Sequence, residues 1–407
     1  MSPAADPLVD VDPARWRILA VLSIAELLGM SLWFAASAVA PELGHRWSLN
    51  ASAIGWLTSV VQLGFVVGTA MSAVLNLADL FPSRWYFATS ALAAAAANAS
   101  LAFTDGYSSA LALRFATGFF LAGVYPPAMK MAATWFRARR GLAIGTVVGA
   151  LVIGKSTPYF VHAFPDASPS TVILIASAGA ICSALLIGSM YHDGPYVFAA
   201  RPFSLKLVGA VASNREWRLA TGGYLGHMFE LYSFWTWIPA FAAASMAAAE
   251  PAASSSAAVS TIAFFAIAVG GLGCVWGGVA ADKRGREWLV TVAMVASGSC
   301  ALLAPLIFGR STLLLVILAA IWGFFVVADS AQFSALATEL VPPHAVGTAL
   351  TIQTSIGFLL TMVSIQLVPV LVGATGWRWA FPMLALGPAV GVMSIRRLVR
   401  VREWANR

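Results

Sequence analysis

The sequence predicts an all-α, polytopic membrane protein with twelve transmembrane helices arranged as two pseudo-symmetric six-helix bundles. The first observation is composition: 60% of the 407 residues are hydrophobic and 10% are charged, whereas soluble domains carry about 25% charged residues. The second is length, because the apolar runs have the roughly 20 residues that a helix needs to cross a bilayer. The third is an internal repeat, in which residues of the first half recur about 204 positions later.

Polar connections divide the chain into twelve apolar runs, six on each side of the longest connection. The spans are expected at residues 16–39, 52–77, 85–103, 109–136, 141–162 and 171–191, and then at 217–244, 259–281, 288–308, 312–340, 345–372 and 377–395. The expected segments are an N-terminal tail (1–15), a first bundle (16–191), a linker (192–216), a second bundle (217–395) and a C-terminal tail (396–407). Such short connections leave no room for a sizeable domain outside the bilayer.

The distribution of positive charge predicts the orientation. If both termini are cytoplasmic, 18 of the 24 Lys and Arg residues lie in cytoplasmic segments and three lie in outer loops, in agreement with the positive-inside rule. The net charge of +7 therefore reflects topology and does not indicate a nucleic-acid partner. We expect a multi-pass protein of the cell (inner) membrane, surrounded by lipid and acting as a monomer.

The repeat is clearest in the first span of each half. Glu26 and Trp33 recur as Glu230 and Trp237, both shifted by 204 residues. Glu26 lies about ten residues, or some 15 Å, into its span and therefore near the bilayer midplane. Glu230 lies at the equivalent depth. This constant shift indicates duplication of a six-helix unit.

A loop motif also occurs twice. The second half keeps it nearly complete, as Gly278, Asp282, Lys283, Arg284, Gly285 and Arg286. In the first half only Asp79 and Arg84 remain, and Leu75 stands where the glycine would be. Each aspartate is expected near a helix start in the opposite half, because the positive end of a helix dipole favours an anion.

With the further motif Arg114-Phe-Ala-Thr-Gly118 in the fourth span, the chain resembles a bacterial-type transporter of the major facilitator superfamily over its whole length. The resemblance implies alternating access by two rocking halves, with spans one, four, seven and ten around a central cavity. It also implies a cytoplasmic gate formed by Asp79, Arg84, Gly278, Asp282, Arg284, Gly285, Arg286 and Glu339. Glu339 is expected to pair with Arg284 or Arg286. The fifth span lacks the Gly-Pro motif of drug/proton antiporters, so the subfamily is unresolved.

Ionisable residues within the spans are the candidates for binding substrate and protons. An ionised group at a helix centre costs at least about 2.5–3.5 kcal/mol, so each one needs a reason. The candidates, together with two neighbouring tryptophans, are Glu26, Trp33, Arg114, Lys130, Lys155, Glu230, Trp237 and Asp329. Low dielectric favours the neutral form of a carboxyl, so Glu26 and Glu230 are expected to exchange protons. The three bases favour an anionic solute.

Several of these residues also have a purely structural interpretation. Glu26 and Arg114 can form a permanent ion pair that fixes helix packing. Lys130 and Lys155 can face an anionic substrate or extend toward the membrane surface. The stripes Glu26–Trp33 and Glu230–Trp237 can bind a ring or only pack between helices, since their i, i+4, i+7 spacing serves both purposes.

The expected function is secondary active transport of a small organic solute, with an anion favoured, by alternating access and with protons as the coupling ion. Efflux of drug-like molecules in exchange for protons is one alternative. A membrane receptor or scaffold that moves no solute is the other. The chain has no nucleotide-binding loop, and its three cysteines and five histidines match no metal or catalytic spacing. We therefore expect no enzyme activity, no cofactor and no metal.

Overall fold

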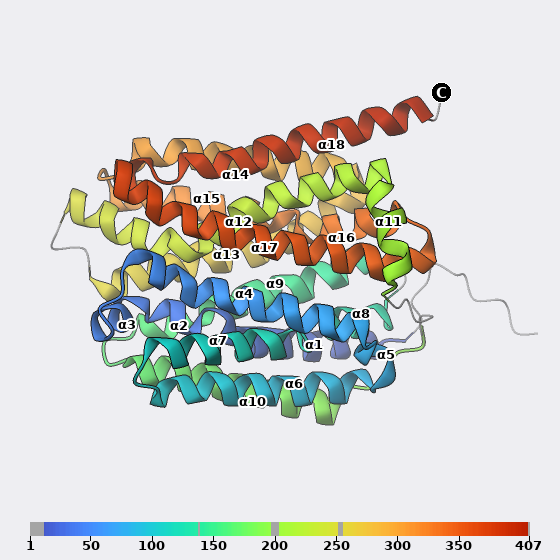
Figure 1. Ribbon diagram of the computed structural model, residues 1–407, viewed down its shortest axis with the longest axis horizontal. Helices are drawn as coiled ribbons and strands as arrows, with labels where there is room; N and C mark the ends of the chain where they lie inside the picture. Colours follow the sequence, from blue (N-terminus) through green and yellow to red (C-terminus); the bar gives the residue numbers. More distant parts are fainter. Residues whose placement is uncertain (1–11, 137–138, 197–202, 251–254, 406–407) are drawn as a thin grey trace, which may run out of the picture.

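Helices run side by side in two layers, and each layer comes from one half of the chain (Figure 1). The computed structural model describes residues 12–136, 139–196, 203–250 and 255–405, without the side chains of residues 78, 79 and 140. Within these ranges every regular element is a helix. The sequence-based expectation of an all-α protein is confirmed.

The first layer holds the elements up to Met190. They are α1 (Ala14–Met30), η1 (Ser31–Phe34), α2 (Ala35–Ala38), α3 (Ala40–Arg46), α4 (Ala51–Val74), α5 (Leu77–Leu80), α6 (Ser83–Ser100), η2 (Leu101–Phe103), α7 (Tyr107–Leu121), α8 (Tyr125–Ala133), α9 (Arg140–His162) and α10 (Pro169–Met190). We call this layer the first bundle.

The second layer begins after a linker that contains a short helix. Its elements are α11 (Leu205–Ser213), α12 (Arg215–Ala249), α13 (Ser256–Arg284), α14 (Arg286–Ile307), α15 (Thr312–Ala328), α16 (Ser330–Glu339), η4 (Pro343–Ala345), α17 (Val346–Thr375), η5 (Trp377–Trp379), η6 (Pro382–Ala385) and α18 (Leu386–Ala405). The linker helix α11, α5 and the end of α18 lie at one end of the molecule, which we call the linker end, and α3 lies at the far end (Figure 1).

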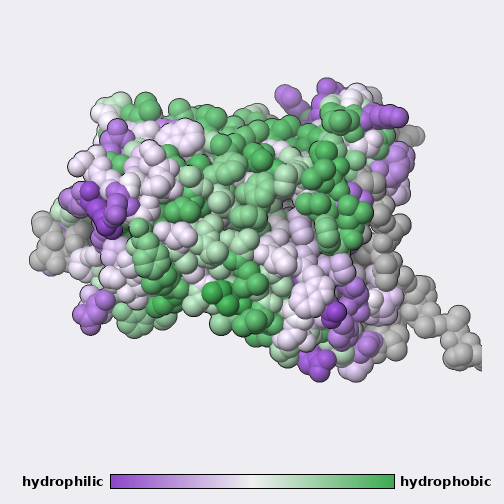
Figure 2. Space-filling view, turned by 60° about the horizontal axis from the view of Figure 1, so that its bottom comes forward, coloured by the Kyte–Doolittle hydropathy of each residue, from purple (hydrophilic) through white to green (hydrophobic). Residues whose placement is uncertain are grey.

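The surface of the molecule matches a bilayer. On the face shown in Figure 2, hydrophobic residues form a broad band across the middle, and hydrophilic residues gather toward the two ends. Eleven helices in the described ranges are long and apolar enough to cross a membrane. The seventh expected span corresponds to α12, which has 35 residues but is less apolar because it carries Glu230 and several Trp, Tyr and Ser residues. The architecture of twelve spans in two bundles agrees with these helices.

Three of the helices expected to line the centre are interrupted. The first span changes to a 3₁₀ turn over Ser31–Phe34. The fourth breaks between Leu121 and Tyr125, before a proline pair that lacks backbone donors. The tenth breaks at Asp329. Interrupted backbone at membrane depth is tolerated where it is buried in protein or lines a cavity, and the residues at these breaks are buried in the bundles.

The two bundles touch along α9 and α13. A Cβ atom on Gly145 would lie 2.9 Å from the carbonyl oxygen of Cys274, and one on Gly149 would lie 2.7 Å from that of Gly271. Such distances are too short for any side chain, so small residues allow these helices to approach closely. Gly145 and Gly149 of the fifth span therefore form part of the seam between the halves.

Candidate functional site

Aromatic side chains fill the centre of the molecule, where the bundles meet. Trp33 of η1 packs against Phe65 of α4, with ring centroids 5.3 Å apart, and against Tyr232 of α12 at 5.8 Å. Phe358 of α17 completes the group at 4.9 Å from Phe65 and 5.2 Å from Tyr232. Two rings come from each bundle. We call these four residues the central aromatic cluster.

Lys155 of α9 places a positive charge against this cluster. Its Nζ donates a hydrogen bond of 2.6 Å to the hydroxyl of Tyr232 and lies 4.2 Å from the ring centroid of Trp33. A third ring, that of Trp235, lies 5.3 Å away. Cation–π attraction at these distances is strongest where water is excluded, and Lys155 is only 3% exposed. Lys155 therefore faces the interface and does not extend to the membrane surface.

Glu26 of α1 is the acidic counterpart of Lys155. The two side chains attract each other electrostatically. Glu26 is fully buried, and neither carboxylate oxygen has a hydrogen-bond partner among the described residues. A buried ionised carboxyl without hydrogen bonds is costly, and attraction to Lys155 offsets part of that cost.

Arg114 of α7 binds backbone carbonyls and Asn98 instead of forming the ion pair with Glu26 that was considered from the sequence. It donates hydrogen bonds to the carbonyl oxygens of Leu32 (2.9 Å), Leu57 (3.3 Å) and Trp33, and to the side-chain oxygen of Asn98 (3.3 Å). Two of these carbonyls belong to the 3₁₀ turn that interrupts the first span. Arg114 thus compensates a helix break, and no ion pair with Glu26 is found in the described part of the chain.

Glu230, the repeat partner of Glu26, lies inside the second bundle. Its two carboxylate oxygens accept hydrogen bonds from Ser297 (2.7 Å) and from the indole of Trp322 (2.8 Å). The ring of Trp322 stacks on Phe234 at 4.5 Å. Trp237, at the end of the same stripe, donates a 2.9 Å hydrogen bond to the carbonyl of Ile365. A Cβ atom on Gly55 of α4 would lie 3.1 Å from the ring of Trp237, so the second stripe packs within its own bundle at Glu230 and reaches the first bundle at Trp237.

Asp329, at the break in the tenth span, lies beside a histidine that sequence reasoning set aside. Nδ1 of His227 is 2.9 Å from a carboxylate oxygen of Asp329, and Nε2 of His227 is 2.9 Å from the hydroxyl of Ser330. Oδ1 of Asp329 has no hydrogen-bond partner in the described structure, so the imidazole and the carboxylate lie close together without a hydrogen bond between these two atoms. His227 precedes Glu230 by one helical turn, and this spacing is the signal that the sequence offered.

The expected gate residues lie at the linker end. A Cβ atom on Gly141, at the start of α9, would lie 2.8 Å from both carboxylate oxygens of Asp282. This carboxylate from the second bundle therefore lies beside the start of a helix in the first. Gly278 also approaches Gly141, because its Cβ would lie 2.8 Å from the Gly141 carbonyl. The side chain of Asp79 lies outside the described residues.

The basic residues of the loop motif have separate partners. Arg286 binds Glu339 at 2.9 Å and donates a 2.8 Å hydrogen bond to Gln332. Arg284 stacks on Trp288, with its guanidinium 4.7 Å from the ring centroid. Gly285 adopts a φ of 90° between α13 and α14, a conformation that favours glycine.

Two further residues of the first bundle complete the candidate set. Arg84 stacks on Trp85 at 5.1 Å. Lys130 is half-buried on α8. Neither residue belongs to the central aromatic cluster.

At the far end, polar side chains join the bundles. His162 at the end of α9 binds Glu42 of α3 through Nε2 (3.0 Å) and Ser260 of α13 through Nδ1 (2.8 Å). Ser52 of α4 donates a 2.7 Å hydrogen bond to Gln366 of α17. The α9–α13 seam is therefore closed both here and at Gly141.

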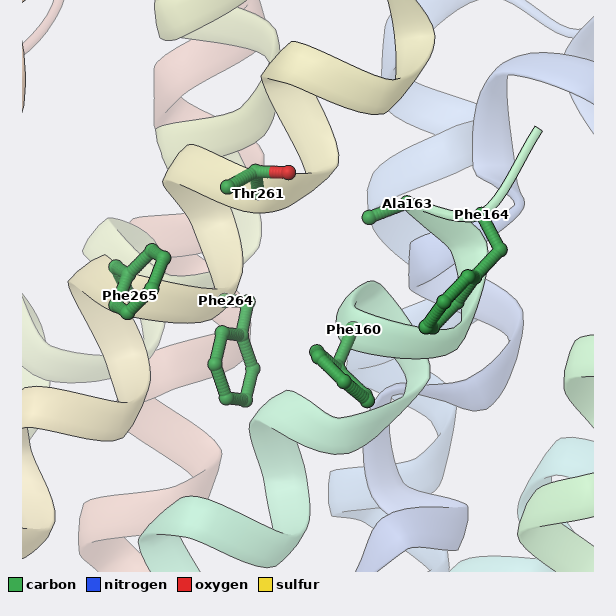
Figure 3. Close-up of a pocket in the computed structure, with 6 residues that line it drawn as sticks. All are labelled: Phe160, Ala163, Phe164, Thr261, Phe264 and Phe265. Atoms are coloured by element: carbon green, nitrogen blue, oxygen red, sulfur yellow. The ribbon is translucent and has the colours of Figure 1, made fainter.

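A small apolar pocket lies beside this link and away from the central charges. It has a volume of about 120 Å³ and is lined by residues of α13 and of the end of α9, namely Phe160, Ala163, Phe164, Thr261, Phe264 and Phe265 (Figure 3). Phe160 and Phe265 are about half exposed, so the pocket opens toward the outside of the bundle. It contains no charged side chain to bind an ion. In the described ranges, no group of three His, Cys, Asp or Glu side chains could hold a metal ion.

Comparison with known proteins identifies the family. Residues 22–246, more than half of the chain, match the family model of the Major Facilitator Superfamily. The chain belongs to the major facilitator superfamily. It is thus a multi-pass membrane transporter and not an enzyme, as the loop motif and the repeat had suggested.

Similar proteins agree with this assignment. The niacin transporter NiaP of Acinetobacter baylyi is 32% identical over 124 residues, a stretch that spans only 28% of this chain and 28% of that relative. A bacterial homologue of the human lysosomal transporter Spinster, in an inward-facing and occupied conformation, superposes with a TM-score of 0.69 at 14% identity and covers 96% of this chain and 98% of its own. A mutant of the nucleoside transporter NupG gives 0.71 at 15% identity, with coverage of 94% and 99%. At these identities the solved structures show a shared fold.

Proposed function

We propose that this transporter carries a small organic anion by alternating access, coupled to protons. The observation that supports the proposal is the buried position of Lys155 between the two bundles. Its ammonium is buried where the bundles meet, it is carried by the first bundle, and it is contacted by Tyr232 and Trp235 of the second. A cation at this position can bind a carboxylate that enters from either side as the halves rock.

Competition between two carboxylates gives the binding step. In the absence of solute, Glu26 balances the charge of Lys155. Glu26 makes no hydrogen bond of its own in the described structure, so a solute carboxylate can replace it as counter-ion without breaking one. The surrounding rings of Trp33, Tyr232 and Phe358 then offer contact to an apolar or aromatic body of the solute.

The curated relative is compatible with such a solute. NiaP is named a niacin transporter, and niacin is an aromatic carboxylic acid. Because the alignment spans less than a third of either chain, the support that it lends is for the class of solute.

The orientation and state of assembly belong to the same proposal. The linker end carries the loop motif, the linker helix α11 and the basic C-terminal helix α18 (Figure 1). We place this end in the cytoplasm of a cell whose inner membrane holds the protein as a monomer. The working halves are then residues 16–191 and 217–395, and Asp282 with Arg286 and Glu339 forms the cytoplasmic gate.

Uptake by proteoliposomes tests the proposal. Purified protein is reconstituted and screened with radiolabelled aromatic and aliphatic carboxylates, uncharged analogues and lipophilic cations. Carboxylates should accumulate, and Lys155→Met should lower their uptake by at least about 30-fold, because truncating one member of a buried charge pair costs roughly 2 kcal/mol or more. Lys206→Met, which removes an exposed linker lysine, is the matched control and should transport normally.

Loss of folding is separated from loss of binding by a second variant. Lys155→Met with Glu26→Gln removes both buried charges and should restore thermal stability without restoring anion uptake. If this double variant or Lys155→Met alone took up carboxylates at the wild-type rate, the anion proposal would be wrong. A wild-type protein that binds solutes but moves none would instead support a receptor or scaffold.

Efflux of lipophilic cations in exchange for protons is the second candidate. The carboxylate oxygens of Glu26 favour it, because they have no hydrogen-bond partner in the described structure and could attract a cation. The same screen separates the two functions, since cation transport should depend on Glu26 and should persist in Lys155→Met. Anion transport should show the opposite dependence.

A further inference from the structure

The exposed face of α18 changes from apolar to basic toward the end of the chain. The helix runs along the edge of the second layer, with its C-terminal turns at the linker end (Figure 1). Leu386, Val390 and Met393 are exposed, and their spacing of four and three residues places them on one face. Exposed apolar side chains within the bilayer contact acyl chains, because apolar surface is unfavourable in water.

Arginines and a tryptophan continue this face. Arg397, Arg400 and Trp404 follow Met393 at steps of four, three and four residues, and Arg396 lies beside them. All four are exposed, Trp404 at 81%. We call Arg396, Arg397 and Arg400 the terminal arginines. At 1.5 Å per residue they lie about 5 to 10 Å beyond Met393, where acyl chains give way to the headgroup layer.

The terminal arginines differ from the next arginine of the helix in their contacts. Nε of Arg402 lies 3.4 Å from a carboxylate oxygen of Glu216 of α12, and its guanidinium donates a 2.6 Å hydrogen bond to Glu287 of α14. No side-chain hydrogen bond, ion pair or ring contact involves the terminal arginines in the described part of the chain. Arg402 thus fixes the end of α18 to its own bundle, while the terminal arginines keep their donors free.

The composition of this face matches an anionic headgroup. Glu403 is the acid on the same exposed segment, and no ion pair joins it to the terminal arginines in the described ranges. The segment therefore keeps a net positive charge. A guanidinium binds phosphate oxygens with two parallel hydrogen bonds, and tryptophan is enriched where membrane and water meet.

The first bundle has no such face. With the shift of 206 residues that relates the C-terminal parts of the two halves, the terminal arginines correspond to Met190, Tyr191 and Gly194. None of these is basic, and α10 ends at Met190, whereas α18 continues to Ala405. Duplication therefore does not explain the basic face, which is specific to the second bundle.

We propose that the terminal arginines and Trp404 bind the phosphate headgroup of an anionic phospholipid in the leaflet at the linker end. The acyl chains of the same lipid lie along Leu386, Val390 and Met393. Arg402 is a positioning residue, because its ion pairs hold the helix end so that the terminal arginines face the lipid. This site is separate from the central aromatic cluster and does not depend on the solute that is carried.

Native mass spectrometry of the purified full-length protein tests the proposal. The wild type should bind its first molecule of phosphatidylglycerol more tightly than phosphatidylcholine. Replacing all three terminal arginines by glutamine should weaken phosphatidylglycerol binding by at least about tenfold, because each arginine at an anionic surface contributes roughly fivefold. Unchanged binding would overturn the proposal.

The matched control removes three other cations at the same end of the molecule. Arg17→Gln with Arg139→Gln and Lys206→Gln, all at exposed positions, should bind phosphatidylglycerol like the wild type. An equal loss in this control would mean that net charge alone determines binding, and would contradict a site on α18.

Two further variants separate binding from folding. Lysine at all three terminal positions keeps the charge and should restore most of the binding, and its absence from such a variant would contradict a headgroup site. Arg397→Gln alone, which removes one charge, should weaken binding by roughly fivefold and carries the test if the triple variant does not fold. Neither glycerol phosphate nor polyglutamate should displace the lipid. Displacement by either would assign the face to a soluble anion or to an acidic protein.

Trp404 reports the location of the lipid. In phosphatidylcholine nanodiscs, the difference in fluorescence between the wild type and Trp404→Phe isolates the emission of this residue. A small fraction of phosphatidylglycerol with bromine high on its acyl chains should quench that emission more than the same fraction of brominated phosphatidylcholine. The preference should disappear when the terminal arginines are replaced by glutamine. Equal quenching by both lipids in the wild type would overturn the proposal.

Discussion

Glu26 and Glu230 occupy equivalent positions in a duplicated sequence, but their surroundings have opposite character. Glu26 has no hydrogen-bond partner in the described structure and acts on a lysine at the interface between bundles. Glu230 accepts two hydrogen bonds inside its own bundle. Duplication thus preserved a carboxyl at one depth in each half, while substitutions around it left one carboxyl buried without hydrogen bonds at the interface and the other fully bonded within its bundle.

The breaks in the helices follow the same division. The first span is interrupted at Ser31–Phe34 and held by Arg114, whereas α12, its repeat partner, continues for 35 residues. The position that corresponds to Arg114 in the second half is Ala319. A guanidinium is present where carbonyl groups need a donor and absent where the helix is intact.

Among the substitutions considered, removal of Arg114 should destabilise the protein most. Arg114→Met leaves three buried carbonyls and Asn98 without their donor, at on the order of 1–3 kcal/mol for each group. We expect a loss of more than about 3 kcal/mol in total and little monodisperse protein after extraction, as measured by size-exclusion chromatography and thermal unfolding. Arg310→Met, an exposed arginine at the far end, should behave as wild type. Equal stability of the two variants would show that the helix break does not need Arg114.

Replacing each carboxyl by leucine should destabilise the protein to different extents, because Glu26 and Glu230 have different partners. Glu230→Leu orphans the hydroxyl of Ser297 and the indole N–H of Trp322, so a loss on the order of 1–3 kcal/mol per donor is expected. Glu26→Leu orphans no hydrogen-bond donor, and Lys155 keeps Tyr232 and its rings. Thermal unfolding should therefore show a larger decrease for Glu230→Leu. The reverse order would mean that the Glu26–Lys155 attraction stabilises more than two hydrogen bonds.

A substitution at the proposed gate should have a smaller effect, which depends on contact between the two halves. Asp282→Asn removes a negative charge from the start of α9, where the helix dipole is worth about 0.3–2 kcal/mol. Transport in proteoliposomes should slow by roughly two- to thirtyfold, corresponding to that range, while insertion and yield stay normal. Asp193→Asn, outside the loop motif, serves as the control. Normal transport by Asp282→Asn would remove this residue from the gate.

The smallest effect concerns pH at the far end. Burial is the largest single influence and raises the pKa of Glu42. The hydrogen bond with His162, a backbone hydrogen bond and the nearby charges of His162 and His45 together exceed it, so the pKa is lowered from its usual value. A lowered pKa stabilises the folded state above the unfolded value, and this contribution disappears as the pH falls through the folded value. At neutral pH, Glu42→Gln should therefore lower the free energy of unfolding by no more than about 1 kcal/mol. This loss should appear as a lower unfolding temperature than that of the wild type. The difference should vanish in strong acid, and a difference that grows on acidification would contradict the assignment.

The sequence was most informative where one rule acts over many residues. Apolar length predicted the spans, the constant shift between Glu26 and Glu230 predicted two halves, and the loop motif predicted the family. These features depend on periodicity and spacing, which a sequence records directly.

What could not be predicted depends on contacts between distant positions. Nothing in Ser31–Phe34 resembles a helix breaker, so the need for Arg114 as a donor was invisible. His227 and Asp329 lie far apart in the chain and meet only because the tenth span breaks. Lys155 could be placed in a span but not oriented, since its direction depends on the rings of Tyr232 and Trp235 in the other bundle.

The hydrogen bonds that Arg114 donates to the first span have a consequence for the order of events during synthesis. The carbonyl of Leu32 and its donor are 82 residues apart, so helix one is synthesised well before its support. At about 5–20 residues per second, the ribosome needs roughly 4 to 16 s to make the intervening chain. During that interval the unbonded carbonyls must be hydrated or held by the insertion machinery. Maturation of the first transmembrane segment therefore has to wait for the fourth.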